Sequence, residues 1–256
     1  MERLNVRTLL LELTRQCNLE CKHCFRGESE NEYMKINLIE KLLKNIARVN
    51  TLVLTGGEPF LAVEQLKKIT DILSQDRMNI EDLIIVTNGT RLTKEILDML
   101  LIINEKTNLE IRISNDKFHQ LELERLNLLD IKKRNVNILK EYFNVDEEIS
   151  FNNTFIIDRT GRAYNLTQKD LDYINSIGDV SIKYIFSNKL ILEKYRERYP
   201  LPKLIEDNVV DGSLNIDVYG NITPTYYSFE AEDNNRFSNI RGNKTLKKAI
   251  TNIKSL

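Results

Sequence analysis

Three cysteines constrain this chain more than any other feature of its sequence. Cys17, Cys21 and Cys24 are the only cysteines among the 256 residues, and they lie within one stretch of eight. A disulfide framework uses an even number of cysteines spread through a small secreted domain, so this odd and bunched set favours a metal site. Thiolates are soft ligands that suit zinc or iron–sulfur clusters. A cluster that normally takes one thiolate per iron would keep one iron open to a reactant.

Zinc is the alternative to an iron–sulfur cluster at this stretch. A tetrahedral zinc site needs a fourth ligand, and His23 is the candidate that the sequence offers. His23 directly precedes Cys24, however, so the two side chains would strain a tetrahedral arrangement. The sequence therefore favours the cluster and leaves zinc open.

The spacing C-x3-C-x2-C resembles the signature of the radical SAM superfamily. In that family three cysteines hold a [4Fe-4S] cluster, and S-adenosyl-L-methionine binds the fourth iron. The resemblance implies that Cys17, Cys21 and Cys24 ligate such a cluster, and that His23 meets the adenine through its backbone. The motif followed by the aromatic Phe25 looks most like the SPASM-type peptide-modifying branch of the family, and we expect Phe25 to be among the cofactor-binding residues.

Strand-like and helix-like patterns alternate along most of the chain. Nearly continuous apolar runs predict buried strands at 8–13, 52–55, 83–87, 109–114 and 180–186. Apolar residues at helical spacing predict helices at 37–49, 63–73, 93–103, 119–133 and 168–177. Such alternation favours right-handed βαβ units. We therefore expect an α/β fold, a partial (β/α)6 TIM-like barrel with its ligands at the carboxyl ends of the strands.

Two further parts of the chain have weaker patterns. A fifth strand falls either at 136–139 or at 151–157. Beyond residue 200 the sequence predicts a hairpin around Gly220 and Asn221 and a final helix at 244–253. We expect a core domain at 1–200 and a small cysteine-free extension, a β-hairpin and a helix, at 201–256.

A glycine-rich turn follows the second predicted strand. Gly56, Gly57, Glu58 and Pro59 form a GGEP sequence, in which two glycines let the backbone approach a neighbour closely. A tight turn explains this pattern by itself. GGEP also resembles the family motif that contacts the amino group of S-adenosylmethionine, and it falls where the family places it.

Polar residues also follow the third and fourth predicted strands. Asn88 lies in a Thr-Asn-Gly turn, and Ser114 and Asp116 form a Ser-x-Asp pair. The family resemblance implies that Asn88 lies near the cofactor and that Ser114 lies near the ribose hydroxyls. Hydroxyl and carboxylate groups suit a diol, although a helix N-cap uses the same residue types. His119 is interpreted as a helix-start histidine rather than a proton shuttle.

The later sequence supports the SPASM-type branch only in part. Gly161-Arg-Ala163 resembles a loop of many members. The extension of that branch normally carries cysteines for auxiliary clusters, and this chain has no fourth cysteine. We therefore expect no self-contained auxiliary cluster and no spare cysteine as a hydrogen-atom donor.

Composition limits the class of protein. The 37 basic and 38 acidic residues nearly cancel, which argues against a large nucleic-acid surface. The apolar run Leu9–Leu11 is too short for a signal sequence or a membrane span. We expect no membrane association and a cytoplasmic setting, in which thiols stay reduced.

The family resemblance implies an enzyme that cleaves S-adenosylmethionine reductively to a 5′-deoxyadenosyl radical, which then abstracts hydrogen from a substrate. We expect a peptide or protein substrate and a flavodoxin- or ferredoxin-type electron donor. Two alternatives stay open: a small-molecule enzyme of a nucleoside pathway, and a non-catalytic cluster-binding protein. No residue is assigned as catalytic acid, base or hydrogen donor.

Overall fold

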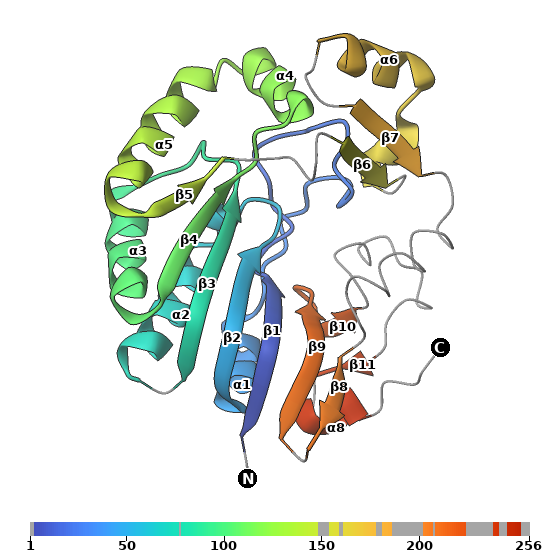
Figure 1. Ribbon diagram of the computed structural model, residues 1–256. Helices are drawn as coiled ribbons and strands as arrows, with labels where there is room; N and C mark the ends of the chain where they lie inside the picture. Colours follow the sequence, from blue (N-terminus) through green and yellow to red (C-terminus); the bar gives the residue numbers. More distant parts are fainter. Residues whose placement is uncertain are drawn as a thin grey trace.

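Figure 1 shows the computed structural model, which describes residues 3–76, 78–147, 154–158, 161–177, 181–185, 202–206, 208–223, 238–240 and 245–251. The described strands are β1 Leu4–Glu12, β2 Ile46–Thr55, β3 Asn79–Thr87, β4 Asn108–Ile113, β5 Asn144–Asp146, β6 Thr154–Asp158, β7 Ser181–Ile185, β8 Lys203–Ile205, β9 Val209–Ile216, β10 Asn221–Thr223 and β11 Ser238–Asn239. The described helices are α1 Ile36–Lys44, α2 Val63–Ser74, α3 Lys94–Lys106, α4 Lys117–Arg125, α5 Leu129–Tyr142, α6 Gln168–Ile177 and α8 Leu246–Thr251, with the 3-10 turns η1 Pro59–Leu61 and η2 Gly161–Asn165.

A sheet in the order β11-β10-β9-β1-β2-β3-β4-β5 forms the body of the protein (Figure 1). Strands β1 to β5 run parallel, and Leu9, Leu52, Leu83 and Leu109 stand side by side across four of them. These leucines belong to the main core, which the sheet shares with residues of α1, α2, α3 and α5. The strands are therefore buried against helices, as expected for βαβ units. The predicted α/β fold with a partial barrel is confirmed.

The opposite, inner face of the sheet has an apolar middle, and loops follow at the carboxyl ends of its strands. Leu10, Val53 and Ile84 form a small apolar cluster in the middle of β1, β2 and β3. The residues that follow the carboxyl ends of the four strands all reach the same edge, because the strands are parallel and in register. The cysteine loop, the GGEP turn, Asn88 and Ser114 therefore come together there.

Several predicted element boundaries are wrong. The helix predicted at 37–49 ends at Lys44, and Ile46 and Val49 are buried residues of β2. Their spacing of three continues the helical pattern by coincidence. The helix predicted at 119–133 is two helices, α4 and α5, with Asn127 between them at a φ of 55°.

The fifth and sixth strands also differ from the expectation. Residues 136–139 lie inside α5, so that alternative is wrong, and the strand beside β4 is the three-residue β5. Strands do form at 154–158 and 181–185, as the sequence predicts. They pair with each other in a separate parallel sheet rather than with β5.

The predicted C-terminal hairpin is confirmed and is built into the main sheet. Ile222 of β10 pairs with Ile216 of β9, antiparallel. Strand β9 also pairs in parallel with β1, where Leu214 lies beside Leu9. Helix α8 confirms the predicted final helix. The division at residue 200 into a core and an extension stays a prediction.

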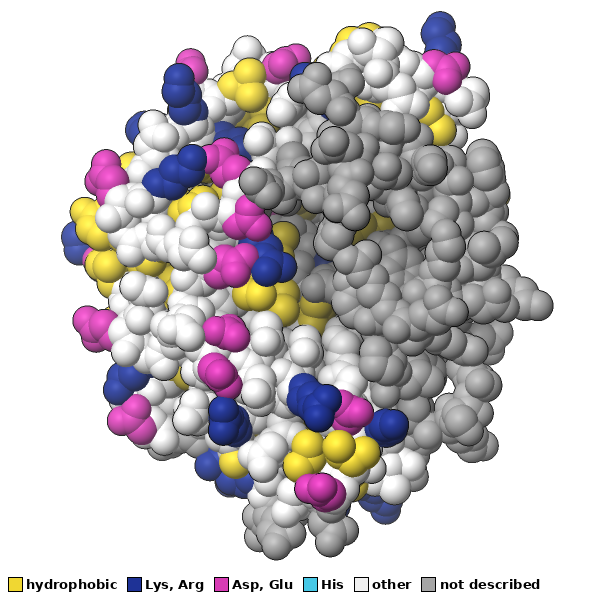
Figure 2. Space-filling view, viewed as in Figure 1, with side chains coloured by type: hydrophobic (Ala, Val, Ile, Leu, Met, Phe, Trp, Pro, Cys, Tyr) yellow, Lys and Arg dark blue, Asp and Glu magenta, His cyan; other side chains and the backbone are white. Residues whose placement is uncertain are grey.

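Two surface observations bear on the expected partners. None of the described helices combines the length and apolar character that crossing a bilayer requires. On the face seen in Figure 2, basic and acidic side chains are interspersed rather than gathered into a patch of one sign.

Replacing Leu214 by Ala is expected to destabilise the whole protein, because β9 belongs to the main core. Leu214 is fully buried, and a leucine-to-alanine change in a core costs about 2–5 kcal/mol. Urea unfolding would measure the change in the free energy of unfolding. Leu101→Ala on the exposed side of α3 is the control, with a cost below about 1 kcal/mol. Equal costs for the two variants would show that β9 is not part of the cooperative core.

Candidate functional site

The three cysteines lie on the loop between β1 and α1, at the carboxyl edge of the sheet. All three are free thiols, Cys21 is buried, and the other two are half-buried. They pack with an apolar group formed by Leu19 of the same loop and by Leu123 of α4. An apolar wall of this kind keeps water away from a metal site.

The donor set fits an iron–sulfur cluster. Tetrahedral zinc with bonds of about 2.3 Å would hold its sulfur ligands about 3.8 Å apart. Of the described residues, only His23, Asp116 and His119 bring three possible ligand atoms within 4.8 Å of one another, so the three sulfurs are spaced too widely for one zinc ion. Burial raises the pKa of the Cys17 thiol to about 12, so its thiolate form needs a bound metal.

The two glycines of GGEP let the cysteine loop pack directly on the end of β2. A Cβ on Gly57 would lie 2.2 Å from the Gln16 carbonyl oxygen, and one on Gly56 would lie 2.5 Å from that of Thr14. The Gly57 N–H donates to the Thr14 carbonyl at 2.7 Å, and the Glu58 N–H donates to that of Gln16 at 2.8 Å. The glycines therefore serve a backbone-to-backbone contact that positions Cys17.

Glu58 joins the ends of β2 and β3. Its carboxylate is fully buried and accepts hydrogen bonds from the Phe60 N–H, the Thr87 hydroxyl and the Asn88 N–H. Burial raises the pKa of Glu58, although these three donors lower it. Because these donors occupy its oxygens, the Glu58 carboxylate mainly stabilises the ends of β2 and β3. Pro59 begins the 3-10 turn η1 directly after it.

Asn88 touches the cysteine loop. Its amide Nδ2 lies 3.0 Å from the Asn18 side-chain oxygen and 3.9 Å from Cys17 Sγ. The side-chain oxygen Oδ1 of Asn88 accepts hydrogen bonds from the backbone N–H and the hydroxyl of Thr90. The side-chain amide of Asn18 donates to the Thr90 hydroxyl at 2.8 Å. Asn88 therefore lies beside the cysteine loop, and its predicted contact with the cofactor stays a prediction.

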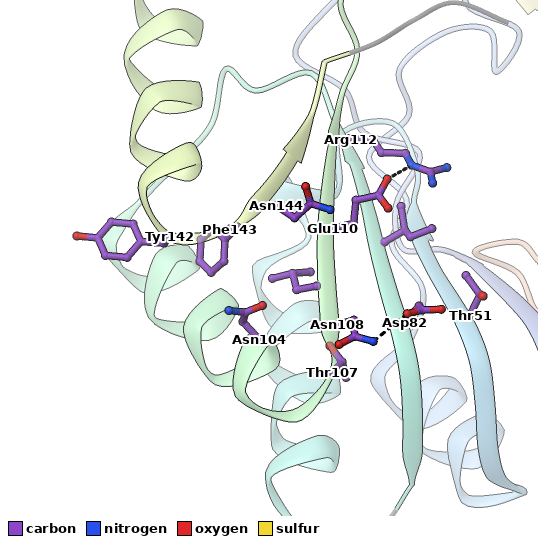
Figure 3. A pocket seen from close by; sticks show the side chains of 12 residues that line it. Thr51, Asp82, Asn104, Thr107, Asn108, Glu110, Arg112, Tyr142, Phe143 and Asn144 are labelled. Carbon is purple, nitrogen blue, oxygen red and sulfur yellow. Dashed lines mark hydrogen bonds and ion pairs between the residues drawn. The ribbon is translucent and has the colours of Figure 1, made fainter.

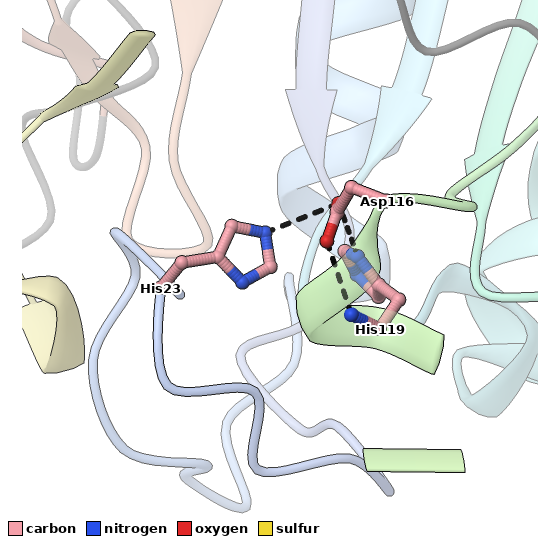
Figure 4. Close-up of side chains that lie close together, drawn as sticks. All are labelled: His23, Asp116 and His119. Atoms are coloured by element: carbon pink, nitrogen blue, oxygen red, sulfur yellow. Dashed lines mark hydrogen bonds and ion pairs between the residues drawn. The ribbon is translucent and has the colours of Figure 1, made fainter. Parts of the chain in front are cut away.

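Asp116 connects α4 to the cysteine loop (Figure 4). One carboxylate oxygen caps α4 by accepting the His119 N–H, and the other lies 2.5 Å from His119 Nδ1 and 3.2 Å from His23 Nε2. The His23 ring stacks on Phe118, with 4.7 Å between the ring centroids. Both carboxylate oxygens of Asp116 already have partners in the protein. A direct contact between Asp116 and the ribose stays a prediction.

The charges in this group are coupled. Burial opposes a charge on Asp116, but the two imidazoles outweigh it and hold the pKa of Asp116 well below the usual range. Burial likewise opposes a charge on His119, and the Asp116 carboxylate outweighs it and raises the pKa of His119 to about 10. The group is therefore a half-buried ion pair at the start of a helix, in agreement with the helix-start interpretation of His119.

Ser114 and Phe25 contact different residues of the protein. The Ser114 N–H donates to the Thr87 carbonyl at 2.8 Å, and its own carbonyl accepts from Lys132 Nζ at 2.7 Å. Phe25 packs beside the guanidinium of Arg26, 5.2 Å from the ring centroid. The structure thus brings Asn88, the GGEP turn and Cys17 together, and the cofactor contacts expected of Ser114 and Phe25 stay predictions.

A buried ion pair lies under the loop. Arg26 pairs with Glu12 at the end of β1 and donates to the Thr55 hydroxyl at 3.2 Å. The second carboxylate oxygen of Glu12 accepts the Val218 N–H of the β9–β10 turn. The C-terminal hairpin thus contacts the base of the cysteine loop.

A polar pocket of about 750 Å³ opens on the inner face of the sheet, near the amino ends of β3 and β4 (Figure 3). Asp82, Glu110 and Arg112 line it, with Glu110 paired to Arg112. Its lining runs from Asn108 at the start of β4 to Arg112 near the end of that strand, and it includes none of the three cysteines.

Sequence reasoning missed several residues of the site. Ser29 accepts the Cys17 N–H at 2.8 Å, and Lys132 is a buried lysine in the first turn of α5. No local pattern marks either residue. Thr90 follows a strand end and could have been noticed for that reason. The missed residues with hydrogen bonds at this edge are Asn18, Ser29, Thr87, Thr90 and Lys132.

Comparison with known proteins identifies the family. The family model described as the radical SAM superfamily matches residues 11–160, more than half of the chain, including the cysteine loop and the GGEP turn. The chain belongs to the radical SAM superfamily. Members of this family use a [4Fe-4S] cluster and S-adenosylmethionine as cofactors.

Individual relatives differ in activity and in length. The uncharacterized protein MJ0907 of Methanocaldococcus jannaschii is 27% identical over 78% of this chain and 68% of its own. Radical SAM cyclopropyl synthase TigE of Paramaledivibacter caminithermalis is 26% identical over 74% of this chain and 49% of its own. The GTP 3′,8-cyclase of Aquifex aeolicus is 26% identical over 80% of this chain and 70% of its own. The chain thus spans only about half the length of TigE.

A solved structure shares the fold. The structure of anSMEcpe with bound AdoMet and the Cp18Cys peptide superposes with a TM-score of 0.58 at 16% identity, covering 96% of this chain and 80% of that one. At this level of identity the likeness concerns the fold.

Replacing Gly57 by Ala is expected to displace the cysteine loop, because the added Cβ has no room against the Gln16 carbonyl. Iron content after anaerobic reconstitution should fall to less than half of the wild-type value. Gly89→Ala is the control, since that glycine has a φ of 75° but its nearest neighbours are side-chain atoms of α5. The control should lose stability and keep its iron. Normal iron in the Gly57 variant would contradict this account of the turn.

Ionisation of Glu12 is expected to make the fold less stable as the pH rises. Burial raises the pKa of Glu12 from 4.5 to about 7, although the Arg26 guanidinium lowers it. Because the folded pKa exceeds the unfolded one, this contribution to stability is complete below pH 4.5 and is lost as the pH rises through about 7. A shift of this size corresponds to about 3 kcal/mol.

The measurement compares Glu12→Gln with the wild type by urea unfolding from pH 4.5 to 8. The free energy of unfolding of the wild type should decrease relative to that of the variant across this interval. Glu64→Gln, at an exposed position of α2, removes the same charge and should leave the wild-type pH profile unchanged. Parallel profiles for the wild type and Glu12→Gln would show that the carboxyl titrates normally.

Proposed function

We propose that this chain is a radical SAM enzyme that modifies a peptide or protein. One observation carries the proposal: three buried or half-buried thiols lie in an apolar loop at the carboxyl edge of a parallel sheet, with the GGEP turn packed against them. Cys17, Cys21 and Cys24 would hold the [4Fe-4S] cluster. When bound, the cluster and S-adenosylmethionine supply a 5′-deoxyadenosyl radical that abstracts hydrogen from the substrate.

The remaining site residues would bind and orient the cofactor. The GGEP turn would offer backbone groups to the methionine end, and Asn88 would stand beside Cys17. Ser114 and the His23 backbone would meet the ribose and the adenine. Asp116 would act through His23, which it holds by an imidazole nitrogen at 3.2 Å. The apolar residues around the thiols would exclude water, which is the usual share of a protein in radical chemistry.

The dimensions of the inner face support a long substrate. Asn108 in the polar pocket and Ser114 at the cofactor edge are six residues apart along β4, which corresponds to about 20 Å at 3.3 Å per residue. An extended peptide of about six residues would match that distance. The sequence resemblance to the SPASM-type branch and the peptide held by anSMEcpe point the same way.

The proposal includes a one-electron donor of the flavodoxin or ferredoxin type and the reducing conditions of the cytoplasm. It includes no auxiliary cluster, since the chain has three cysteines. A small-molecule substrate is the second candidate, because GTP 3′,8-cyclase is among the relatives. A non-catalytic cluster-binding protein is the third possibility, and cleavage of S-adenosylmethionine distinguishes it from the other two.

Anaerobically reconstituted protein is expected to form 5′-deoxyadenosine from S-adenosylmethionine when a reductant is added. Cys21→Ala should lower this activity at least a hundredfold, because a buried ligand of the cluster is lost. Chromatography of the products provides the measurement. Stoichiometric zinc without iron-dependent activity would refute the proposal, and a normal iron load without cleavage would favour the non-catalytic alternative.

The same assay separates the two substrate classes. A synthetic peptide encoded beside the gene should raise 5′-deoxyadenosine formation and gain or lose mass, while GTP should have no effect. Stimulation by GTP alone would favour the small-molecule alternative.

A further inference from the structure

The turn η2 reaches back to the cysteine loop from far along the chain. Gly161 begins this turn with a φ of 56°. A Cβ at Gly161 would lie 2.5 Å from both the Cys24 carbonyl oxygen and the Gly27 nitrogen. Only glycine therefore allows the turn to rest on the backbone of the loop.

Arg162 binds three backbone carbonyls of that loop. Its backbone N–H donates to the Cys24 carbonyl at 2.9 Å. In the side chain, Nε donates to the Cys21 carbonyl at 3.0 Å, and Nη2 lies 3.5 Å from the Leu19 carbonyl oxygen. The Arg162 side chain is 13% exposed. A planar guanidinium presents several donors in a rigid fork, which suits carbonyls held in a fixed arrangement.

These bonds orient the peptide units around the cysteines. The Leu19 carbonyl points to Arg162, whereas the Leu19 N–H donates to Cys17 Sγ at 3.4 Å. The Cys21 carbonyl accepts hydrogen bonds from Arg162 Nε and from the Cys24 N–H. The second of these bonds closes the turn between Cys21 and Cys24. With its carbonyl held by Arg162, Leu19 keeps its own N–H on the side of the Cys17 sulfur. Hydrogen bonds to ligand sulfurs are among the factors that set the reduction potential of a cluster.

We propose that Arg162 is a positioning residue that holds the cysteine loop in its cluster-binding conformation and keeps the Leu19 N–H directed at Cys17 Sγ. The proposal rests on the proposed function, because it assumes the cluster. Arg162 acts through Leu19 and Cys21 and touches no reacting atom. Without it, the loop binds the cluster less completely and at a more negative potential.

The chain offers a matched control. Arg125 also lies beside the loop, but it is 56% exposed and binds the carboxylates of Glu20 and Glu122 instead of loop carbonyls. Arg162→Lys and Arg125→Lys each keep the positive charge and remove the guanidinium fork. A difference between them therefore reports on the carbonyl contacts and not on charge.

The experiment reconstitutes wild type, Arg162→Lys and Arg125→Lys anaerobically and measures iron and sulfide per chain. It also records the electron paramagnetic resonance spectrum of the reduced cluster and its midpoint potential. Arg162→Lys is expected to retain less than half of the wild-type iron, and its remaining cluster should have a more negative potential and an altered spectrum. Arg125→Lys should match the wild type. Wild-type iron, spectrum and potential in Arg162→Lys would overturn the proposal.

Two further measurements guard against a variant that fails to fold. Gly161→Ala retains Arg162 but pushes the turn off the loop, so it should change the same quantities in the same direction; unchanged values would also overturn the proposal. In the wild type, hydrogen exchange at the Arg162 amide should slow at least tenfold when the cluster binds, and equal rates would count against the coupling. A wild-type protein that takes up no iron would refute the proposed function instead.

Discussion

The close approach of two backbones underlies the site. The segment Thr14–Gln16 continues β1 into the cysteine loop, and it lies against Gly56 and Gly57 with no room for a Cβ. Two backbone hydrogen bonds join these segments and place Cys17 beside the end of β2. A side chain at either glycine would separate the loop from the sheet. Everything at this edge therefore depends on the absence of two side chains.

Polar groups from two remote parts of the chain and one pair that flanks the loop then hold it. Glu58 joins the ends of β2 and β3, Arg162 binds loop carbonyls, and Glu12 pairs with Arg26 beneath the loop. Each of these groups is largely buried. Removing one partner would cost more free energy than the hydrogen bond or ion pair contributes, because the other partner would stay buried and unpaired. The arrangement gives the cysteines a defined geometry before any metal binds.

The same edge also explains why the parallel sheet matters for function. Strands β1 to β4 deliver the loop, the GGEP turn, Asn88 and Ser114 to one place because they share a direction and a register. The apolar group around Leu19 and Leu123 keeps that place dry. Away from it, the inner face becomes polar at the pocket beside Glu110 and Arg112.

The sequence by itself determined the strand–helix alternation, the cysteine loop and the GGEP turn, because each is written in residues close together in the chain. It misjudged where α1 ends, since Ile46 and Val49 fit both a helix and a strand. Only the tertiary structure decided the contacts around the loop. Arg162 meets Cys21 across 141 positions, and β9 joins β1 although the hairpin pattern is local. Such pairings depend on how whole elements pack, and no local spacing encodes them.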